Sequence, residues 1–237
     1  MHKGTFEYTD GATICEGYVA SDGKPGRKPC VLIAHQWAGL FEQEQAKAEY
    51  FAGKGYVGFA IDVYGKGVRG AHGQDNSAYM GPYLNDRAKL RQRLLAAVAA
   101  AKARPDVDPN RIAIIGYCFG GTTSLEIARS GADVKAVVGF HSGLATARPQ
   151  DAANIKARVL VCIGADDPII PPEQRLAFEK EMKSAGIDWR LQLYGGAGHS
   201  FTNPAADSRG MKGFFYHEAT DRRSWNAMIE LFGETLN

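Results

Sequence analysis

Short hydrophobic runs recur along the chain and predict buried β-strands. They are PCVLIAH (29–35), YVGFAID (56–62), RIAIIG (111–116), VKAVVGF (134–140), RVLVCIG (158–164) and WRLQLYGG (189–196). Apolar runs of this length are typical of strands that are covered on both faces of a sheet. Before them, TFEYTD and TICEGYVA alternate weakly between polar and apolar residues and are split by Asp10-Gly11, which predicts an N-terminal β-hairpin.

Segments with helical periodicity separate these strands. A helix is predicted from Glu44 to Lys54, and a longer one over about 77–104, in which apolar residues recur at spacings of three and four. Pro105 ends the longer helix, and DPN (108–110) predicts a turn before the next strand. Two more helices are predicted in PPEQRLAFEKEMKSAG (171–186) and in the tail, DRRSWNAMIELFGETL.

The order of these elements predicts the fold class. A hairpin followed by repeated strand–helix units indicates an α/β protein whose mostly parallel central sheet has an antiparallel N-terminal edge and helices on both faces. The sequence has no linker, low-complexity tract or internal repeat, so we expect one domain over residues 1–237.

Composition and charge narrow the class of partner. The chain has 237 residues, is 45% hydrophobic and carries a formal net charge of +2, so neither nucleic acid nor a membrane surface is an expected partner. The N-terminus lacks the apolar core of a signal peptide. The cysteines are far apart without metal-ligand spacing, which predicts a reduced, cytoplasmic setting and no metal site.

Polar and reactive residues gather directly after the predicted strands. His35 to Gly39 follow the first buried strand, Asp62 to Lys66 the second, His141 and Ser142 the fourth, and Gly164 to Pro168 the fifth. Because ligands of open α/β sheets bind at the carboxyl ends of the strands, one site at this edge is expected. His35 and His141 are interpreted mainly as structural residues.

The third buried strand is followed by GYCFGG (116–121) and then by a helical segment. A nucleophile elbow needs small residues two before and two after the nucleophile, and Gly116 and Gly120 meet that need. Cys118 would lie at a helix N-terminus, where the local positive potential favours the thiolate. On this motif alone, a structural cysteine in a glycine-rich turn is an equally good interpretation.

Later strand ends supply the partners that a cysteine nucleophile needs. In α/β-hydrolases the order along the chain is nucleophile, acid, histidine, which Cys118, Asp167 and His199 reproduce. The histidine would hold the thiol proton and the aspartate would orient the imidazole. Asp166 is the alternative acid; Asp167 is favoured because Asp166 is expected to point to the opposite side of the turn.

Acyl transfer also needs two N–H donors for the oxyanion. The backbone N–H of Phe119, directly after Cys118, is one candidate, and that of Trp37, in the loop HQWAG after the first buried strand, is the other. Trp37 could instead be a half-buried loop aromatic.

These motifs resemble the dienelactone hydrolase (carboxymethylenebutenolidase) family of the α/β-hydrolase fold. The matching segments are AHQWAGL, DVYG, GYCFGG, GADDPIIP and GHSF, and the similarity extends over nearly the whole chain. The resemblance implies a Cys118–His199–Asp167 triad, no cofactor, and hydrolysis of a small-molecule lactone or activated ester, by a monomer or a small homo-oligomer.

Two positions depart from the family's pattern. The family has a glutamate that interacts with the resting thiol where this chain has Gln36, and an amide cannot accept a proton. Family members that act on dienelactone also bind its carboxylate with arginines, one of them just after the histidine. Here Thr202 and Asn203 stand there, and the nearest downstream arginine is Arg209. A neutral ester or lactone is therefore at least as good a candidate substrate.

Residues 63–88, rich in glycine and tyrosine, have no core pattern and could form a lid over the strand ends or an ordered surface loop. Tyr64, Arg69 and Tyr79, together with Gln36, are the candidate substrate contacts. The leading hypothesis is a cysteine-dependent hydrolase that forms a thioester acyl-enzyme. The alternatives are a general carboxylesterase or thioesterase on the same triad, and a weakly active or non-catalytic small-ligand-binding relative, which Gln36 keeps open.

Overall fold

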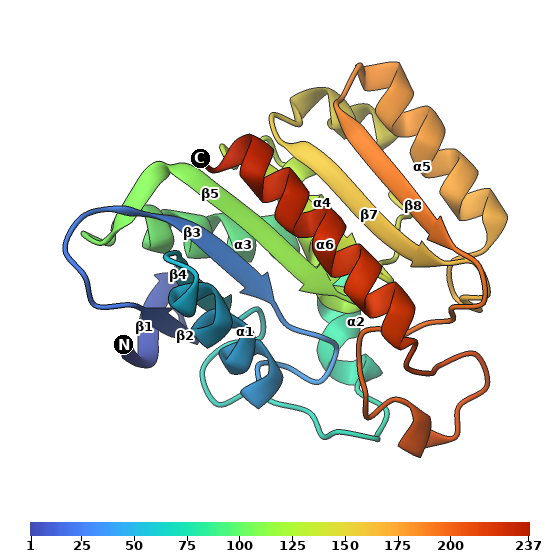
Figure 1. The fold of residues 1–237 in the computed structure, drawn as a ribbon, viewed down its shortest axis with the longest axis horizontal. Helices are drawn as coiled ribbons and strands as arrows, with labels where there is room; N and C mark the ends of the chain where they lie inside the picture. Colours follow the sequence, from blue (N-terminus) through green and yellow to red (C-terminus); the bar gives the residue numbers. More distant parts are fainter.

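The computed structural model describes residues 1–237, apart from the side chain of Arg209. It contains an eight-stranded sheet in the order β1-β2-β4-β3-β5-β6-β7-β8 (Figure 1). The strands are β1 (His2–Asp10), β2 (Thr13–Ser21), β3 (Lys28–Ala34), β4 (Val57–Ile61), β5 (Val107–Tyr117), β6 (Ala136–Phe140), β7 (Arg158–Gly164) and β8 (Trp189–Tyr194). Only the pairings of β2 with β1 and β4 are antiparallel in this sheet, so the predicted fold class is confirmed.

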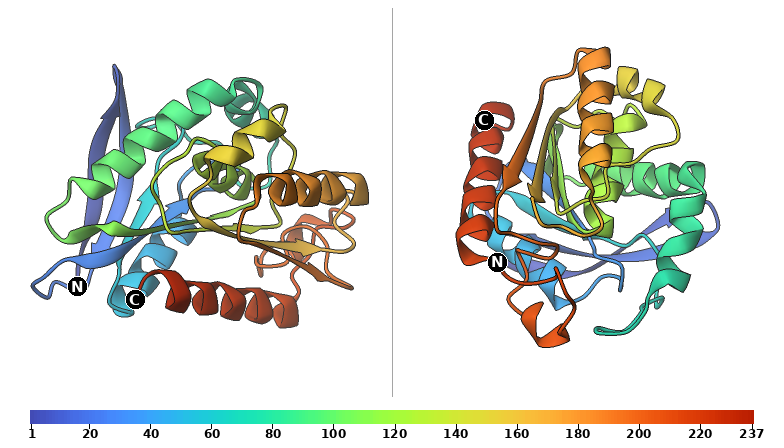
Figure 2. Two further views of the ribbon diagram at one scale, coloured as in Figure 1. Left: turned by 90° about the horizontal axis from the view of Figure 1, so that it is seen from above. Right: turned by 90° about the vertical axis from the view of Figure 1, so that its right-hand side faces the viewer.

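Helices cover both faces of the sheet (Figure 2). The α-helices are α1 (Glu42–Gly53), α2 (Ser77–Asn85), α3 (Arg87–Lys102), α4 (Phe119–Arg129), α5 (Pro172–Ala185) and α6 (Glu218–Thr235), and two short 3₁₀ helices are η1 (Pro149–Asn154) and η2 (Asp207–Arg209). Side chains of α1 and α6 pack on one face of the sheet, and those of α3, α4 and α5 pack on the other.

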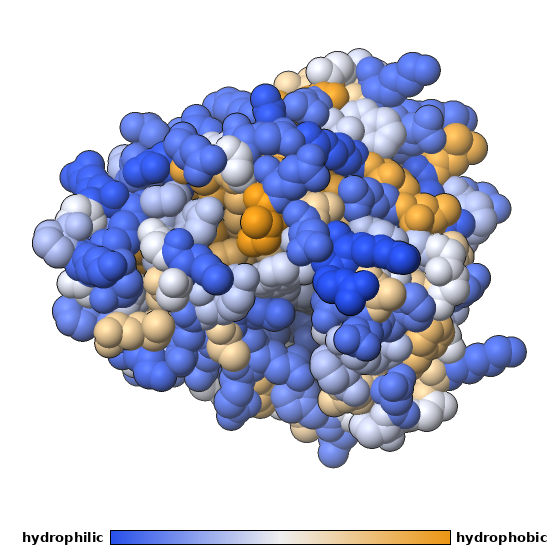
Figure 3. All heavy atoms as spheres, viewed as in Figure 1, coloured by the Kyte–Doolittle hydropathy of each residue, from blue (hydrophilic) through white to orange (hydrophobic). Residues whose placement is uncertain are grey.

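The central strands are buried on both faces, as their continuous apolar sequences predict. In β3, Val31 and Ile33 join the core beneath α1 and α6, whereas Leu32 joins the core on the opposite face. Burying each such side chain contributes about 1.5–3 kcal/mol. Hydrophilic residues cover most of the molecular face that includes α1 and α6 (Figure 3). No described helix is both long and apolar enough to cross a membrane.

Two local predictions are wrong. The single helix predicted over about 77–104 is two helices, because Asp86 adopts a non-helical backbone and its side chain accepts a hydrogen bond from the Lys89 N–H at 2.9 Å. This N-cap outweighs the continuous apolar periodicity. The turn predicted at DPN lies inside β5, where the register with β3 shifts between Lys28 and Cys30 and so accommodates the extra residues.

A buried charge cluster anchors α4, the helix that follows Cys118. The Arg129 guanidinium is fully buried, donates to both carboxylate oxygens of Glu181 at 2.8 Å, and donates to Glu126 at 3.1 Å. It also donates to the Leu144 carbonyl at 2.9 Å. Removing one member would leave an unpaired buried charge, which typically costs about 3–5 kcal/mol. The cluster therefore fixes α4 against α5 and the loop after β6.

Candidate active site

Cys118 occupies the tip of a sharp strand-to-helix turn between β5 and α4. Its backbone is left-handed, with φ 56° and ψ −118°, a conformation that is strained for a residue with a Cβ. A Cβ at Gly116 would lie 2.0 Å from the Gly120 carbonyl oxygen, and one at Gly120 would lie 2.2 Å from that of Ala34. Only glycine fits these two positions, so the turn has the geometry that the sequence predicts for an elbow.

Backbone hydrogen bonds hold this strained turn in place. The Cys118 N–H donates to the Phe140 carbonyl at 3.0 Å, and the Cys118 carbonyl accepts from Gly121 at 3.0 Å. The Cys118 side chain is half-buried, whereas the other cysteines, at positions 15, 30 and 162, are fully buried. Burial raises the pKa of the Cys162 thiol to about 12. Cys118 is thus the cysteine that combines partial exposure with a place at a helix N-terminus.

Asp167 and His199 are joined by a hydrogen bond. The distance between His199 Nδ1 and Asp167 Oδ2 is 2.8 Å, and both side chains are almost completely buried. The other carboxylate oxygen of Asp167 accepts from the Ile169 N–H at 2.9 Å. Asp166 is exposed, whereas Asp167 is the carboxylate that is hydrogen-bonded to the imidazole. With Nδ1 donating to the carboxylate, Nε2 is the nitrogen left to accept a proton.

His199 responds to Cys118 as well as to Asp167. Burial of the ring lowers its pKa, but the charge of Cys118 and the hydrogen bond to Asp167 outweigh burial and raise the pKa of His199 to about 9. Nε2 is buried and has no hydrogen-bond partner among the described residues. The imidazole of His199 therefore holds a proton more tightly than an ordinary histidine does.

Two aromatic rings fix the His199 imidazole from the sides. The His141 ring lies 4.8 Å away in an edge-to-face arrangement, and the Phe214 ring lies 4.9 Å away. His141 is fully buried, and its Nε2 is 2.9 Å from Thr202 Oγ1. Burial and the neighbouring His199 lower the pKa of His141 well below its usual value, so this ring stays neutral. The sequence indicated that His141 lies near the site because this residue follows a predicted strand. Nothing in the sequence indicated that Phe214 contacts His199.

The backbone N–H groups of Phe119 and Trp37 are the two oxyanion donors that the sequence predicts. Phe119 is the first residue of α4, and Trp37 follows the end of β3. Neither N–H donates to an acceptor among the described residues. Tyr64 links the two segments, because its hydroxyl donates to the Trp37 carbonyl at 2.8 Å and its ring stacks on that of Phe119 at 5.8 Å. Tyr64 therefore ties the loop after β3 to the start of α4.

Comparison with known proteins identifies the family. The pattern of the dienelactone hydrolase family matches residues 15–236. The chain belongs to the dienelactone hydrolase family. It is accordingly a hydrolase that acts on ester bonds.

Individual family relatives cover the whole chain. A dienelactone hydrolase-like promiscuous phosphotriesterase from metagenomic libraries is 39% identical, with a TM-score of 0.93 over 100% of this chain and 99% of its own. A solved protein named m3DLH is 41% identical, with a TM-score of 0.94 over the same shares. Protein usf of Aquifex pyrophilus is 26% identical over 97% of each chain.

Gln36, where the family resemblance leads one to expect glutamate, is turned towards α1. Its side-chain amide donates to Gln43 Oε1 at 3.0 Å. A carboxyl group nevertheless lies nearby, because Glu44 is only 4% exposed and lines the same hollow as Gln36. Glu44 accepts from the Phe41 N–H at 3.0 Å, and burial raises its pKa to about 7. The sequence placed Glu44 at the start of a helix but gave no sign of its burial.

The other predicted substrate contacts have different environments. Arg69 donates to the backbone carbonyls of Leu40 and Val68 at 2.9 and 2.7 Å, so this side chain ties the loop after β4 to the loop after β3. Tyr64 is buried. Tyr79, on α2, is 38% exposed, and its ring stacks on that of Tyr64 with the ring centres 6.1 Å apart. His35 is fully buried between Gln36 and the next strand end, which fits its structural interpretation.

Several hollows mark the surface of this dienelactone hydrolase family member. One of about 950 Å³ lies between η1 and α5 and is lined by none of the predicted site residues. Three smaller ones lie along the loop after β3. Gln36 lines the hollow of about 230 Å³, Trp37 lines the one of about 820 Å³, and both residues line the one of about 10 Å³. Among the described residues, no group of three or more His, Cys, Asp and Glu side chains is placed to hold a metal ion.

Proposed function

We propose that the protein hydrolyses lactones or activated carboxylic esters through a Cys118–His199–Asp167 triad. The observation that carries the proposal is the buried 2.8 Å hydrogen bond between His199 and Asp167 beside a strained, half-exposed cysteine. Family membership supports the ester-bond chemistry. The elbow geometry and the raised pKa of His199 support the assignment of Cys118 as the nucleophile.

The chemistry has two halves. In the first, the Cys118 thiolate attacks the ester carbonyl carbon, and the N–H groups of Phe119 and Trp37 stabilise the developing oxyanion. The C–O bond to the leaving group then breaks, and the imidazolium of His199 donates its proton to the departing oxygen. A thioester on Cys118 and a free alcohol or enol result.

In the second half, neutral His199 accepts a proton from water, and the resulting hydroxide attacks the thioester carbonyl. The C–S bond breaks, the carboxylic acid leaves, and the thiolate–imidazolium pair is restored. A thiol has a pKa of about 8.5, so its thiolate is expelled from the first tetrahedral intermediate more readily than an alkoxide. The proposed substrates are therefore esters and lactones whose leaving groups depart as easily as a thiolate.

The direct test is p-nitrophenyl acetate hydrolysis by the wild type and by Cys118→Ser and His199→Ala. We expect each substitution to lower kcat/KM at least about a hundredfold. Cys30→Ala, which alters a buried cysteine near the start of β3 and so away from the carboxyl ends of the strands, serves as the matched control. Mass spectrometry of an acyl adduct on Cys118 provides the second readout. Full activity in both triad variants would rule out the proposal.

A second candidate activity is hydrolysis of phosphotriesters with good leaving groups. The 39% identical neighbour is described as a promiscuous phosphotriesterase and covers the whole chain. Attack of the thiolate on phosphorus, with the same two N–H donors on the phosphoryl oxygen, would expel a phenolate and leave an S-phosphorylated cysteine for water to hydrolyse. Release of p-nitrophenolate from paraoxon that is lost in Cys118→Ser tests this candidate.

The non-catalytic alternative makes a different prediction for the thiol. A binding protein without an activated cysteine would show alkylation of Cys118 by iodoacetamide that follows an ordinary thiol pKa of about 8.5. A thiolate paired with His199 instead reacts well below that pH. The alkylation rate between pH 5 and 9 separates the two interpretations without any knowledge of the substrate.

A further inference from the structure

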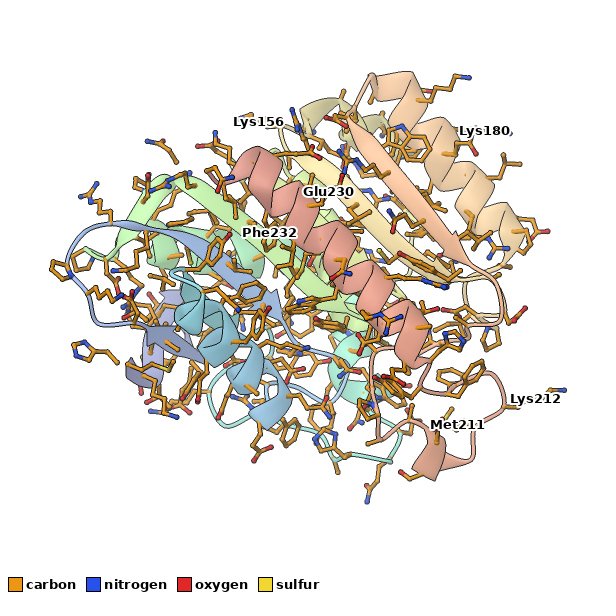
Figure 4. The ribbon with its side chains drawn as sticks, viewed as in Figure 1. Lys156, Lys180, Met211, Lys212, Glu230 and Phe232 are labelled. Carbon is orange, nitrogen blue, oxygen red and sulfur yellow. The ribbon has the colours of Figure 1, made fainter. Side chains whose placement is uncertain are left out.

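A groove of about 820 Å³ begins at the side chain of Trp37. The other residues that matter on its walls are Gln43, His72, Asp75, Ser208 and Met211. Met211 belongs to the segment that joins η2 to α6, and Figure 4 shows it near the N-terminal end of α6. The volume lies within the range of about 300–1,000 Å³ that is usual for small-molecule sites. We call this hollow the Trp37 groove.

The Trp37 groove and the candidate active site share the residue Trp37. Its wall residue Trp37 carries one of the two N–H groups proposed for the oxyanion. Tyr64 fixes that residue to the elbow, since it bonds to the Trp37 carbonyl and stacks on Phe119. A small hollow lined by Gln36, Trp37 and His72 shares walls with the groove and with the hollow beside Glu44. A molecule whose carbonyl oxygen reaches the Trp37 N–H thus has the groove next to it.

The walls of the groove suit an uncharged group. Trp37 and Met211 offer apolar surface, and Met211 is 47% exposed. The ring of His72, whose centre lies 4.4 Å from that of Phe41, presents a second flat surface to the groove. Gln43 and Ser208 can form hydrogen bonds with neutral oxygen atoms.

The charges around the groove disfavour a carboxylate. Among the described side chains on its walls, none is a lysine or arginine, and Asp75 contributes a carboxylate. Arg69 is bound to backbone carbonyls. Lys47 lines the adjacent hollow together with Glu44, and its ammonium lies 4.4 Å from the centre of the Trp225 ring. An anionic group in the groove would therefore lose hydration without a described cation to replace it.

We infer that the Trp37 groove binds the non-reacting part of the substrate and that this part is uncharged, such as an aryl group or a medium-length chain. The inference rests on the proposed function and specifies its substrate class. Met211 and His72 are the residues that set this preference. The groove thus selects neutral esters and lactones over those that carry a free carboxylate.

Two matched pairs of esters test the inference. One pair varies the acyl side, as p-nitrophenyl methyl succinate against p-nitrophenyl hemisuccinate. The other varies the leaving group, as the acetates of methyl 4-hydroxybenzoate and of 4-hydroxybenzoate. Either the acyl group or the leaving group of an ester occupies the groove, and one of the two pairs varies that end. In that pair, we expect the wild type to have a higher kcat/KM for the neutral ester. Met211→Lys should shift the kcat/KM ratio of that pair about two- to fivefold towards the anionic ester.

The control is Leu176→Lys, which adds the same charge at a position on α5 that is 52% exposed and lies outside the groove. A ratio that shifts in Met211→Lys and not in the control supports the inference. Equal shifts in the two variants, or no shift in either pair, overturn it. Hydrolysis that survives Cys118→Ser and His199→Ala would instead contradict the proposed triad, so the two failures are distinguishable.

Discussion

The side chain of Gln36 donates to Gln43 at 3.0 Å, and no hydrogen bond joins Gln36 to Cys118 among the described residues. Where the family pattern has a glutamate in contact with the resting thiol, this chain has an amide held by the first turns of α1. In the proposed mechanism, His199 therefore takes the thiol proton without competition from a carboxylate at position 36.

Gln36→Glu should consequently slow alkylation of Cys118. A carboxylate near the sulfur favours the neutral thiol, because like charges raise the thiol pKa. We expect the iodoacetamide rate at pH 7 to fall about three- to tenfold, with the pH profile displaced upward. Gln45→Glu, one residue beyond Glu44 on α1, is the matched control. An alkylation rate that stays the same or rises would contradict this explanation of Gln36.

Asp167→Asn should remove the orientation of the imidazole while preserving the size of the side chain. The amide can donate to Nδ1, which places the proton of the neutral ring on Nε2, where a general base cannot use it. We expect kcat/KM for p-nitrophenyl acetate to fall about 10²- to 10⁴-fold. The exposed neighbour gives the control, and Asp166→Asn should change kcat/KM less than about twofold. The opposite ranking would reassign the acid to Asp166.

The pKa of His199 should depend on Cys118. Burial favours the neutral ring, so the pKa of about 9 is sustained largely by the sulfur charge, with Asp167 second. Cys118→Ala should lower the His199 pKa by at least about one unit. Nuclear magnetic resonance titration of the imidazole measures this directly. An unchanged pKa in Cys118→Ala would mean that Asp167 alone holds the proton.

Stability should fall as Glu44 ionises. Burial raises the pKa of Glu44 from 4.5 to about 7, so the folded protein binds its proton more tightly than the unfolded chain does. The associated stability is fully present below pH 4.5 and is lost as the pH rises through 7. This shift corresponds to roughly 3 kcal/mol. Urea denaturation at pH 5 and 8 should therefore show a smaller difference in Glu44→Gln than in the wild type. Glu42→Gln, an exposed change in the same turn, should keep the wild-type difference.

The sequence predicted the sheet and the placement of chemistry because both follow from periodicity. Apolar runs such as RVLVCIG become buried strands, and parallel strands bring their polar ends to one edge, so Asp167 and His199 could be expected to meet. The break before α3 was missed because one capping side chain, Asp86, outweighed a continuous apolar pattern. The residues beside His199 were missed because loop contacts such as Phe214 on the imidazole follow no period.

The same reason hid the neighbours of Gln36. Burial of Glu44 and the bond to Gln43 depend on how α1 packs beside the loop after β3, and nothing in the spacing of EQEQ distinguishes a buried acid from a solvated one. Arg69 is a comparable case. Its place in a glycine-rich segment suggested a substrate contact, which stays a prediction, whereas its hydrogen bonds to the Leu40 and Val68 carbonyls had no signal in the sequence.

The segment that follows η2 serves two parts of the molecule at once. The His199 N–H donates to the Gly213 carbonyl at 2.7 Å, and the Phe215 N–H donates to the His199 carbonyl at 3.1 Å, while Met211 in the same segment forms a wall of the Trp37 groove. The backbone that holds His199, the proposed general base, is thus only two residues from a surface where substrate is proposed to rest. The same short segment would therefore contribute both to substrate binding and to the position of His199. A substitution of Met211 that changes substrate preference is expected to change the orientation of His199 as well.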